Sequence, residues 1–572
     1  MGSISDEWRG PVDVLVDRLR ARDDLLVREV VDEDEVPLRG GGDDPGAAGG
    51  AHDGGGAEVA VTTASGSRTF TAAHGPFTRY ERRVAWRTEQ DGVVVEQTVS
   101  WRLGIPYWRG LYEPLVKRAL RHGIAPGARP WWLFPDRLSV RQARAAAAMA
   151  LFSLVSGLVY GQLTQVLTFA SADIGDGSSG QQAAIFALVR VGAVLTALMM
   201  FQADRFGRRR IALWSFGIAI ALSIATALVP GLAALTVLQA ISRNLAVAGL
   251  LAVDTICVEE LPAGSRAMAA GLGALAYGLG AGVVVVSLPL ADIASWGWRL
   301  VFGISILTVP LVISGARTLR ESGRFQLLSA ATGRVDAGDP VHQGTHADVA
   351  VAPLEPGPVE PGPVVESPVG AEAPVESSRV SRSRFLLLAA LFLLVNLFIA
   401  PVSQLQNDYL RSDRGFDGLT ITIFTVLTGT PASLGVIVGG RLADTRGRRW
   451  ALIPGLVALG VFTAVFFSVA GAPMWVSALV AAVLGTLTVA PLGVLAPELF
   501  PTARRGGARG ALNVLAVTGS VLGLLLAGLG VDANGYGPTF ALLALGPLLA
   551  AVLAFAVPET RGRELEDLNR AD

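Results

Sequence analysis

The sequence predicts an all-α membrane protein with twelve transmembrane helices in two six-helix bundles, and a small α+β N-terminal region is one interpretation of what precedes them. Three observations support this fold class. The chain of 572 residues is 51% hydrophobic and 17% charged, with a mean hydropathy of +0.49, which is too apolar for an ordinary soluble domain. It contains a dozen apolar runs long enough to cross a bilayer. It also repeats one charged turn, ADRFGRRR at Ala203 and ADTRGRRW at Ala443.

The composition also excludes several classes of protein. A net charge of −1 gives no basis for nucleic-acid binding. Cys257 is the only cysteine, so disulfides within the chain and cysteine-rich metal sites are excluded. The chain lacks a glycine-rich phosphate loop ending in lysine, which argues against an ATP-driven pump. We therefore expect neither a metal nor a cofactor.

Residues 1–140 are expected to lie in the cytoplasm, because the start MGSISDEWRG is polar and acidic and does not resemble a secretory signal. Asp91-Gly92 between two alternating stretches predicts a β-hairpin. A helix with one apolar face is predicted after it, formed by Trp108, Leu111, Tyr112, Leu115, Val116, Ala119 and Leu120. Either the region is a small α+β domain, or this helix lies on the membrane surface or packs on the transmembrane part.

From Ala145 onward, apolar runs of about 20 residues predict the membrane spans. The first bundle, residues 141–327, holds spans at 145–170, 181–202, 211–229, 232–255, 267–290 and 299–317. The second bundle, residues 381–558, holds spans at 385–409, 418–440, 450–470, 473–496, 508–530 and 537–557.

The loops between spans set the orientation. Most loop arginines follow spans 2, 4, 8 and 10, and cytoplasmic loops carry the excess of basic residues. Both termini, including a tail at 559–572, are therefore expected in the cytoplasm, with the protein in the plasma membrane. Residues 328–380 contain EPGPVEPGPVVESPVGAEAP, a Pro-rich composition that cannot form a core and predicts a disordered cytoplasmic linker.

Charges recur at matching distances in the two halves. Glu259 lies 55 residues after Asp204, and Glu498 lies 54 residues after Asp444. Parallel repeats of this kind suit a protein in which two similar bundles rock about a site between them and expose it to each side in turn.

The motifs resemble those of the major facilitator superfamily. GRLADTRGRR at 440–449 is similar to that family's signature between the second and third helices of each half. LRESGRFQLL after span 6, PELFPTARRG, and VPETRGRELEDL after span 12 resemble its sugar porter and organic ion transporter branch. The resemblance covers about residues 140–568. It implies a secondary transporter that works by alternating access and is driven by a proton gradient, not an enzyme.

The repeats and the resemblance together predict an inner gate and conformational network. The resemblance implies that Gly440 allows a close approach of two helices, that Asp444 caps a helix and pairs with an arginine, and that Gly447 forms the turn. Charge-assisted pairs of this kind gain strength when partly desolvated. In the alternative interpretation the arginines only set topology. The predicted network comprises Asp204, Gly207, Arg208, Arg209, Glu259, Arg266, Glu321, Arg324, Gly440, Asp444, Gly447, Arg448, Arg449, Glu498, Arg504, Arg505 and Glu559.

Two arginines within the bilayer are candidates for substrate binding, since ionisable residues there are functional candidates by default. Arg190 in span 2 and Arg243 in span 4 lie at similar depth, about 20 Å from the inner boundary. They predict an anionic solute, unless they pair with Asp173, Asp176 or helix carbonyls instead. Neutral candidates around them are Gln162, Gln165, Gln404, Gln406 and Asn407.

Asp254 and Asp408 are the candidates for proton coupling. Gln162 stands near the position where sugar porters often carry a coupling aspartate, so a sugar substrate does not follow. The expected partners are a small-molecule solute and the lipid bilayer, and the oligomeric state is left open. Two alternatives also stay open: a drug or metabolite efflux pump, and a membrane solute sensor.

Overall fold

The computed structural model describes residues 2–10, 18–31, 65–89, 92–124, 130, 132–262, 265–322, 326, 382–499 and 505–559. The chain forms two compact units. The first unit comprises Met1–Arg324 with Leu410–Ile423, and the second comprises Phe325–Tyr409 with Phe424–Asp572. The predicted linker at 328–380 and the tail beyond Glu559 lie outside the described residues.

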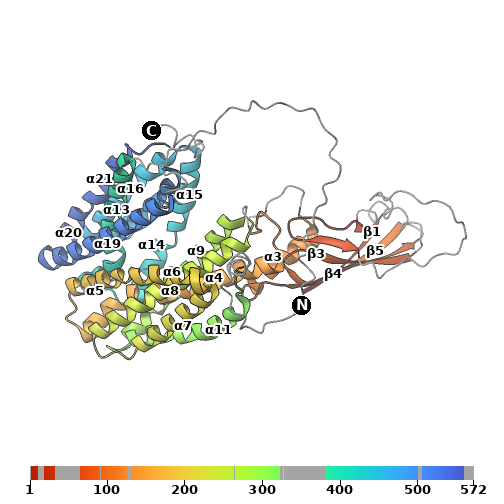
Figure 1. The fold of residues 1–572 in the computed structure, drawn as a ribbon, viewed down its shortest axis with the longest axis horizontal. Coiled ribbons are helices and arrows are strands. Elements are labelled where there is room, and N and C mark those ends of the chain that lie inside the picture. The colour runs from red at the N-terminus through yellow and green to blue at the C-terminus, as the bar shows by residue number, and fades with distance from the viewer. Residues whose placement is uncertain are drawn as a thin grey trace, which may run out of the picture. The chain divides into compact units, whose positions relative to one another are not determined.

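The first unit begins with a five-stranded antiparallel sheet in the order β1-β5-β4-β3-β2 (Figure 1). Its strands are β1 (Gly2–Gly10), β2 (Arg28–Val31), β3 (Ser65–His74), β4 (Phe77–Glu89) and β5 (Gly92–Leu103). The predicted hairpin is present, because Glu89 pairs with Gly92 across β4 and β5.

Helix α3 (Arg109–His122) follows the sheet and packs on it. Its buried residues Val116, Ala119 and Leu120 join one apolar cluster with sheet residues such as Val99 and Trp101. The N-terminal region is therefore an α+β structure. The predicted apolar face of the helix continues through Leu111, which is 67% exposed, so only part of that face is used against the sheet.

A buried ion pair holds β2 to β4. Glu29 accepts a hydrogen bond of 2.6 Å from the Arg82 guanidinium and one of 2.5 Å from the Tyr80 hydroxyl. Burial and the Glu29 carboxylate raise the pKa of Tyr80 well above its ordinary value, so its hydroxyl stays a donor. Since the loss of either charge would strand the other in the core, this pair helps to hold β2 and β4 in place on either side of β3.

The transmembrane part of the first unit is helical. Its elements are α4 (Val140–Ile174), α5 (Ser179–Val191), α6 (Ala193–Phe206), α7 (Arg208–Thr226), α8 (Leu232–Glu260), α9 (Arg266–Ser287), η3 (Leu288–Asp292), α10 (Trp298–Gly303), η4 (Ile304–Leu307) and α11 (Thr308–Thr318). Ser139 and Gln142 form a capping box at the start of α4, which explains why this helix begins at Val140.

The remaining helices complete the second half of the sequence. They are α13 (Arg382–Asp408), the π-helical turn η5 (Tyr409–Asp413), α14 (Gly418–Gly429), α15 (Ala432–Thr445), α16 (Arg448–Ser468), α17 (Ala472–Gly485), η6 (Thr486–Thr488), α18 (Val489–Leu499), α19 (Arg505–Asn534), α20 (Tyr536–Leu543) and α21 (Leu545–Ala554).

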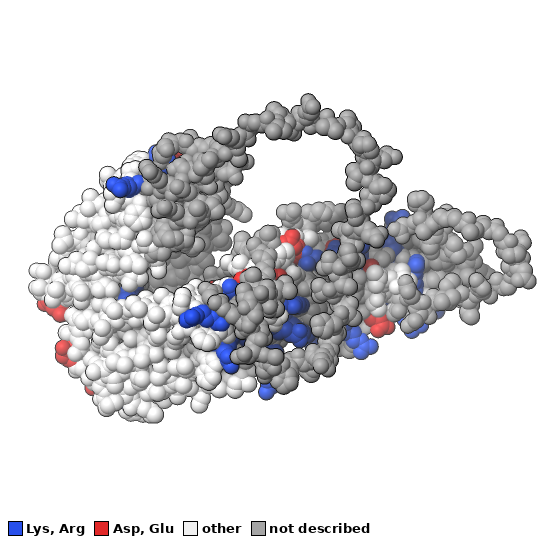
Figure 2. Space-filling model, viewed as in Figure 1, with Lys and Arg blue, Asp and Glu red and all other residues white. Residues whose placement is uncertain are grey.

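Within the described residues, twelve helical segments are long and apolar enough to cross a membrane, as the sequence predicts. Figure 2 shows that the visible surface of these helices is largely free of charged residues. Two spans break where the apolar runs predict continuous helices. Span 2 breaks at Gly192, where a Cβ would lie 2.5 Å from the amide nitrogen of Asn244, and span 8 breaks before Ala432 at Pro431.

Candidate functional site

Each half of the sequence contains a glycine turn between its second and third spans. Gly207 has φ +98° and Gly447 has φ +118°, a left-handed conformation that residues with a Cβ rarely adopt. At Gly447 a Cβ would also lie only 2.6 Å from a carboxylate oxygen of Glu559. The second turn therefore needs glycine for its backbone and for space.

A glutamate caps the helix that follows each turn. Glu321 accepts the backbone N–H of Arg209 at 3.0 Å. Glu559 accepts those of Arg448 at 2.8 Å and Arg449 at 3.4 Å. The first N–H groups of a helix have no partner inside the helix and favour negative charge, so both carboxylates lie where a helix start stabilises them.

An arginine in each turn also binds the end of the last span of its half. The Nε of Arg209 donates to the carbonyl of Leu319 at 2.7 Å, and the Nε of Arg449 donates to that of Val557 at 2.7 Å. Arginine satisfies carbonyls left open at a helix end. The third span is thus tied to the sixth in the first unit, and the ninth to the twelfth in the second.

The first unit adds an ion pair between α7 and α8. Arg208 and Glu259 are 2.5 Å apart, with 16% and 19% of their side chains exposed. The predicted pairing of Glu259 with Arg266 is not tested, because the Arg266 side chain lies outside the described part. The same holds for the side chains of Asp204, Asp444, Glu498 and Arg505, and for Arg324 and Arg504 as a whole.

The close helix approach expected at Gly440 occurs at two earlier glycines of α15, one position before it and one helical turn before that. A Cβ on Gly440 would meet its nearest neighbour, Ala490, at 3.8 Å, which is ordinary contact. A Cβ on Gly439 would lie 2.7 Å from Leu487, and one on Gly435 would lie 1.8 Å from the carbonyl of Val483. The glycines that let α15 approach its neighbours are therefore Gly435 and Gly439.

The most distinctive group inside the first bundle surrounds Arg243 of α8. Its side chain is buried, with 3% of the residue exposed. One guanidinium nitrogen donates to the Thr164 hydroxyl at 3.0 Å, and the guanidinium carbon lies 3.9 Å from the ring centroid of Tyr160. The Nε is buried without a hydrogen-bond partner. Arg243 forms no ion pair with any residue that the structure describes.

A second cation belongs to the same group. Arg190 of α5 lies within electrostatic range of both Arg243 and the Tyr160 hydroxyl. The Tyr277 ring of α9 lies 6.3 Å from that of Tyr160. Two cations and two tyrosines thus converge from α4, α5, α8 and α9. We call Tyr160, Thr164, Arg190, Arg243 and Tyr277 the cation cluster.

The acids that could have neutralised these arginines are engaged elsewhere. Asp173 accepts the indole N–H of Trp298 at 2.9 Å. Asp176 accepts the backbone N–H of Ser178 at 2.8 Å. The alternative in which the arginines pair with these two acids therefore does not describe this structure.

Two predicted glutamines of the first bundle differ in their surroundings. Gln162 is fully buried, and it donates to the carbonyl of Val301 at 2.8 Å and accepts from Ser223 at 2.5 Å. It accepts a further bond from Ser305 at 3.1 Å, so its amide is used in packing between helices. Gln165 of α4 is half-buried and also has an interaction partner.

In the second unit, polar candidates gather at the end of α13. Gln404 and Asn407 are each 5% exposed and Gln406 is partly buried. Asp408 is completely buried and accepts a hydrogen bond from the hydroxyl of Tyr536. In the first unit, Asp254 of α8 is partly buried and makes no hydrogen bond or ion pair with a described residue.

Sequence reasoning missed the aromatic partners and an ion pair at the other end of the first unit. Tyr160 and Thr164 are one helical turn apart on α4, a weak signal that hydrophobic spans often contain. Arg411, which follows the predicted span 385–409, pairs with Asp292 at 2.7 Å and lies 3.9 Å from the ring centroid of Phe169. No spacing rule predicts a contact across so many residues.

Comparisons with known proteins agree with the fold. A family model described as Major Facilitator Superfamily matches residues 385–571. The cis,cis-muconate transport protein of Acinetobacter baylyi is 27% identical over 344 residues, which cover 57% of this chain and 73% of that protein. The human solute carrier family 67 member A1 is 30% identical over 201 residues, covering 32% of this chain and 46% of that protein.

Solved structures share the same architecture. The inward-open xylose transporter of E. coli superimposes with a TM-score of 0.55 at 17% identity, over 75% of this chain and 98% of that one. A bacterial homologue of the lysosomal transporter Spinster gives a TM-score of 0.54 at 15% identity, over 75% of this chain and 98% of that one. At such identities the likeness establishes the fold alone.

Proposed function

We propose that this chain is a multi-pass membrane transporter of the major facilitator superfamily and that it moves a small organic anion by alternating access. The observation that supports the proposal is Arg243, a buried cation without an acidic partner among the described residues. A buried charge is costly unless it is paired. An anionic solute would supply the missing negative charge.

The geometry of the cation cluster favours a carboxylate. The unbonded Nε of Arg243 offers an N–H, and guanidinium binds carboxylate through charge-assisted hydrogen bonds. Arg190 offers a second positive charge nearby, and the Tyr160 and Tyr277 rings would contact an apolar body between the charges. One relative is a transport protein for cis,cis-muconate, which is a carboxylate.

Proton coupling, if the transporter is a symporter, requires a carboxyl group that can gain and lose a proton. We infer that Asp408 is the better candidate, because it is completely buried and bonded to Tyr536, whereas Asp254 is only partly buried. The proposal also includes a plasma-membrane location with both termini in the cytoplasm, on the basis of the loop arginines.

Counterflow in proteoliposomes tests the substrate class. Vesicles loaded with an unlabelled mono- or dicarboxylate, cis,cis-muconate first, would take up the labelled anion through the wild-type protein. Arg243→Gln should weaken binding by more than tenfold, well beyond the effect of an exposed ion pair, which is about 1 kcal/mol or less. Arg243→Lys should retain part of the affinity, because it keeps the charge but not the planar fork.

Arg317→Gln is the matched control, since it removes the same charge from an exposed position on α11. Unchanged anion affinity in Arg243→Gln, or a transported solute that is a cation, would show the proposal to be wrong. The same assay separates a sensor, which would bind the anion without counterflow. An efflux pump would also show counterflow, and uptake and efflux measured in cells with and without the protein separate it from an importer.

A further inference from the structure

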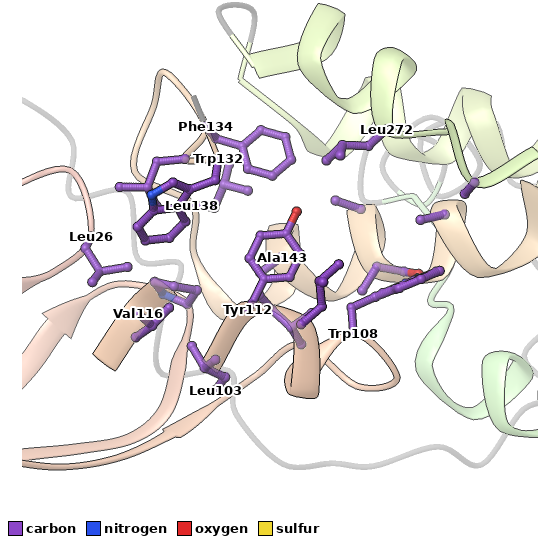
Figure 3. Close-up of a pocket in the computed structure, with 18 of the residues that line it drawn as sticks. Leu26, Leu103, Trp108, Tyr112, Val116, Trp132, Phe134, Leu138, Ala143 and Leu272 are labelled. Carbon is purple, nitrogen blue, oxygen red and sulfur yellow. The ribbon is translucent and has the colours of Figure 1, made fainter. Parts of the chain in front are cut away.

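An apolar cavity of about 140 Å³ lies in the first unit where the N-terminal structure meets the bundle (Figure 3). Leu103 at the end of β5 and Tyr112 and Val116 of α3 form one wall. The segment 132–138, the first turns of α4 and the first half of α9 form the others. The cavity therefore joins an extramembrane domain to two membrane spans.

The lining of this cavity offers little to a polar ligand. Asp136 is the only charged residue among those that line it, and its carboxylate accepts the Ser265 hydroxyl at 2.9 Å. The indole N–H of Trp108 is bonded to the carbonyl of Ala147 at 3.1 Å. A cavity of comparable volume, about 150 Å³, that is lined by apolar side chains stays dry and binds apolar molecules such as benzene.

One side of the cavity is continuous with the outer surface of a membrane span. Leu275 and Leu279 of α9 line it and are 63% and 53% exposed. The span that contains them begins at Met268, so they lie about 10 and about 16 Å along the helix from its start. Because the hydrocarbon core is about 30 Å thick, Leu275 lies at the depth of the lipid tails of one leaflet and Leu279 lies near the middle of the bilayer.

The aromatic residues of the cavity agree with this depth. Trp108, Tyr112 and Trp132 surround its extramembrane side, and tryptophan and tyrosine concentrate at the boundary between lipid headgroups and tails. In Figure 3 the Tyr112 hydroxyl points into the space between these side chains. A hydrocarbon chain that enters past Leu275 would therefore pass from the lipid-tail region into the apolar cavity, which lies beside the boundary between headgroups and tails.

We propose that this cavity binds the acyl chain of a membrane phospholipid, taken from the leaflet on the side of the N-terminal sheet. Bulk lipid is the source that the geometry favours, because the cavity opens along the exposed, apolar face of a membrane-spanning helix. The bound chain would fill the contact between α3 and the start of α4 and α9. It would thereby fasten the N-terminal domain to the bundle.

Photolabelling of the full-length protein in vesicles tests the site. The vesicles contain phosphatidylcholine with a trace of the same lipid carrying a diazirine near the end of one acyl chain. Labelled peptides are then mapped by mass spectrometry. We expect labels within 132–138 as well as on the exposed part of α9 around Leu275 and Leu279. A parallel sample with a diazirine fatty acid, in unlabelled lipid, distinguishes a free acid from a phospholipid.

Two variants probe the cavity itself. Ala150→Phe fills it from α4 and should lower labelling of 132–138 at least fivefold, whereas Val286→Phe, at a 65% exposed position on α9, should leave it unchanged. Leu111→Glu places a charge at a 67% exposed lining position, so it should fold and yet lower the same labelling.

Wild-type protein labelled on α9 but never within 132–138 would overturn the proposal, and so would equal labelling of wild type and both cavity variants. Labelling by the fatty acid alone would show that phospholipid is the wrong source. None of these outcomes depends on which solute the protein transports.

Discussion

The two halves of the helical part share one turn and differ in their interiors. Gly207 and Gly447 both have positive φ, and Glu321 and Glu559 both cap the following helix. Inside, however, the first unit buries the cation Arg243, while the second buries the acid Asp408.

This contrast separates the turn residues, which hold the helices together, from the buried charges, which are candidates for transport. The turn is determined by backbone geometry: a helix start needs an acceptor and a left-handed residue needs glycine, so each half must use the same residue types. Interior positions carry no such constraint. A buried charge there persists despite its cost, and we infer that the halves diverge where they meet the solute and the coupling ion.

The largest effect is expected at Asp408. If this acid carries the proton, Asp408→Asn should lower solute accumulation driven by a pH gradient at least tenfold. Counterflow, which needs no gradient, should stay nearly unchanged. The amide oxygen can still accept the hydrogen bond from Tyr536, so the fold should persist. Uptake with and without an imposed pH gradient measures the difference.

Asp413→Asn is a suitable control for this prediction, because it removes an acid that is 46% exposed and paired with Arg414. Gradient-driven uptake that survives in Asp408→Asn but is lost in Asp254→Asn would transfer the coupling role to the first unit. The proposed division between a cationic and an acidic half would then fail.

A smaller effect is expected at the two capping glutamates. Glu321→Gln and Glu559→Gln keep the shape of the cap and remove its charge. Hydrogen bonds to charged groups are stronger than neutral ones by about 1 kcal/mol, so each change should lower the midpoint of thermal unfolding by about 2–4 °C. Tryptophan fluorescence during heating in detergent measures it.

Glu7→Gln, an exposed position in β1 with 52% of its side chain accessible, should leave that midpoint unchanged. A loss in Glu559→Gln without any loss in Glu321→Gln would mean that the two turns are not equivalent. Equal decreases in the unfolding midpoint of the two variants would support the equivalence of the two turns.

The sequence predicts the fold well because its signals are local. A run of about 20 apolar residues crosses a bilayer as an α-helix. All twelve predicted spans have counterparts in the structure. The hairpin predicted from Asp91-Gly92 is likewise a local signal, and the pairing of β4 with β5 confirms it. The breaks at Gly192 and Pro431 were not predicted, because glycine and proline do not always interrupt a span: Pro401 and Pro454 lie inside continuous helices.

The candidate site was less predictable, because its contacts are between distant residues. The sequence assigned Glu321 and Glu559 to the predicted network, but it did not show that both accept backbone N–H groups. Depth along the helix selected Arg243, but its contacts with Tyr160 and Thr164 depend on how α8 packs on α4. The roles of all these residues in transport stay predictions.

The smallest effect is expected for the segment between the halves. Replacing residues 335–378 with a flexible Gly/Ser sequence of equal length should change counterflow by less than about twofold, because a Pro-rich composition of this kind supplies no core to lose. If each helical half folds through its own contacts, as the separate capped turns suggest, the sequence of the connection matters less than its length. Membrane insertion, checked by fractionation, should also be unaffected. A strong loss of transport with normal insertion would show that the connection itself regulates the halves, and the comparison between them would then have to include it.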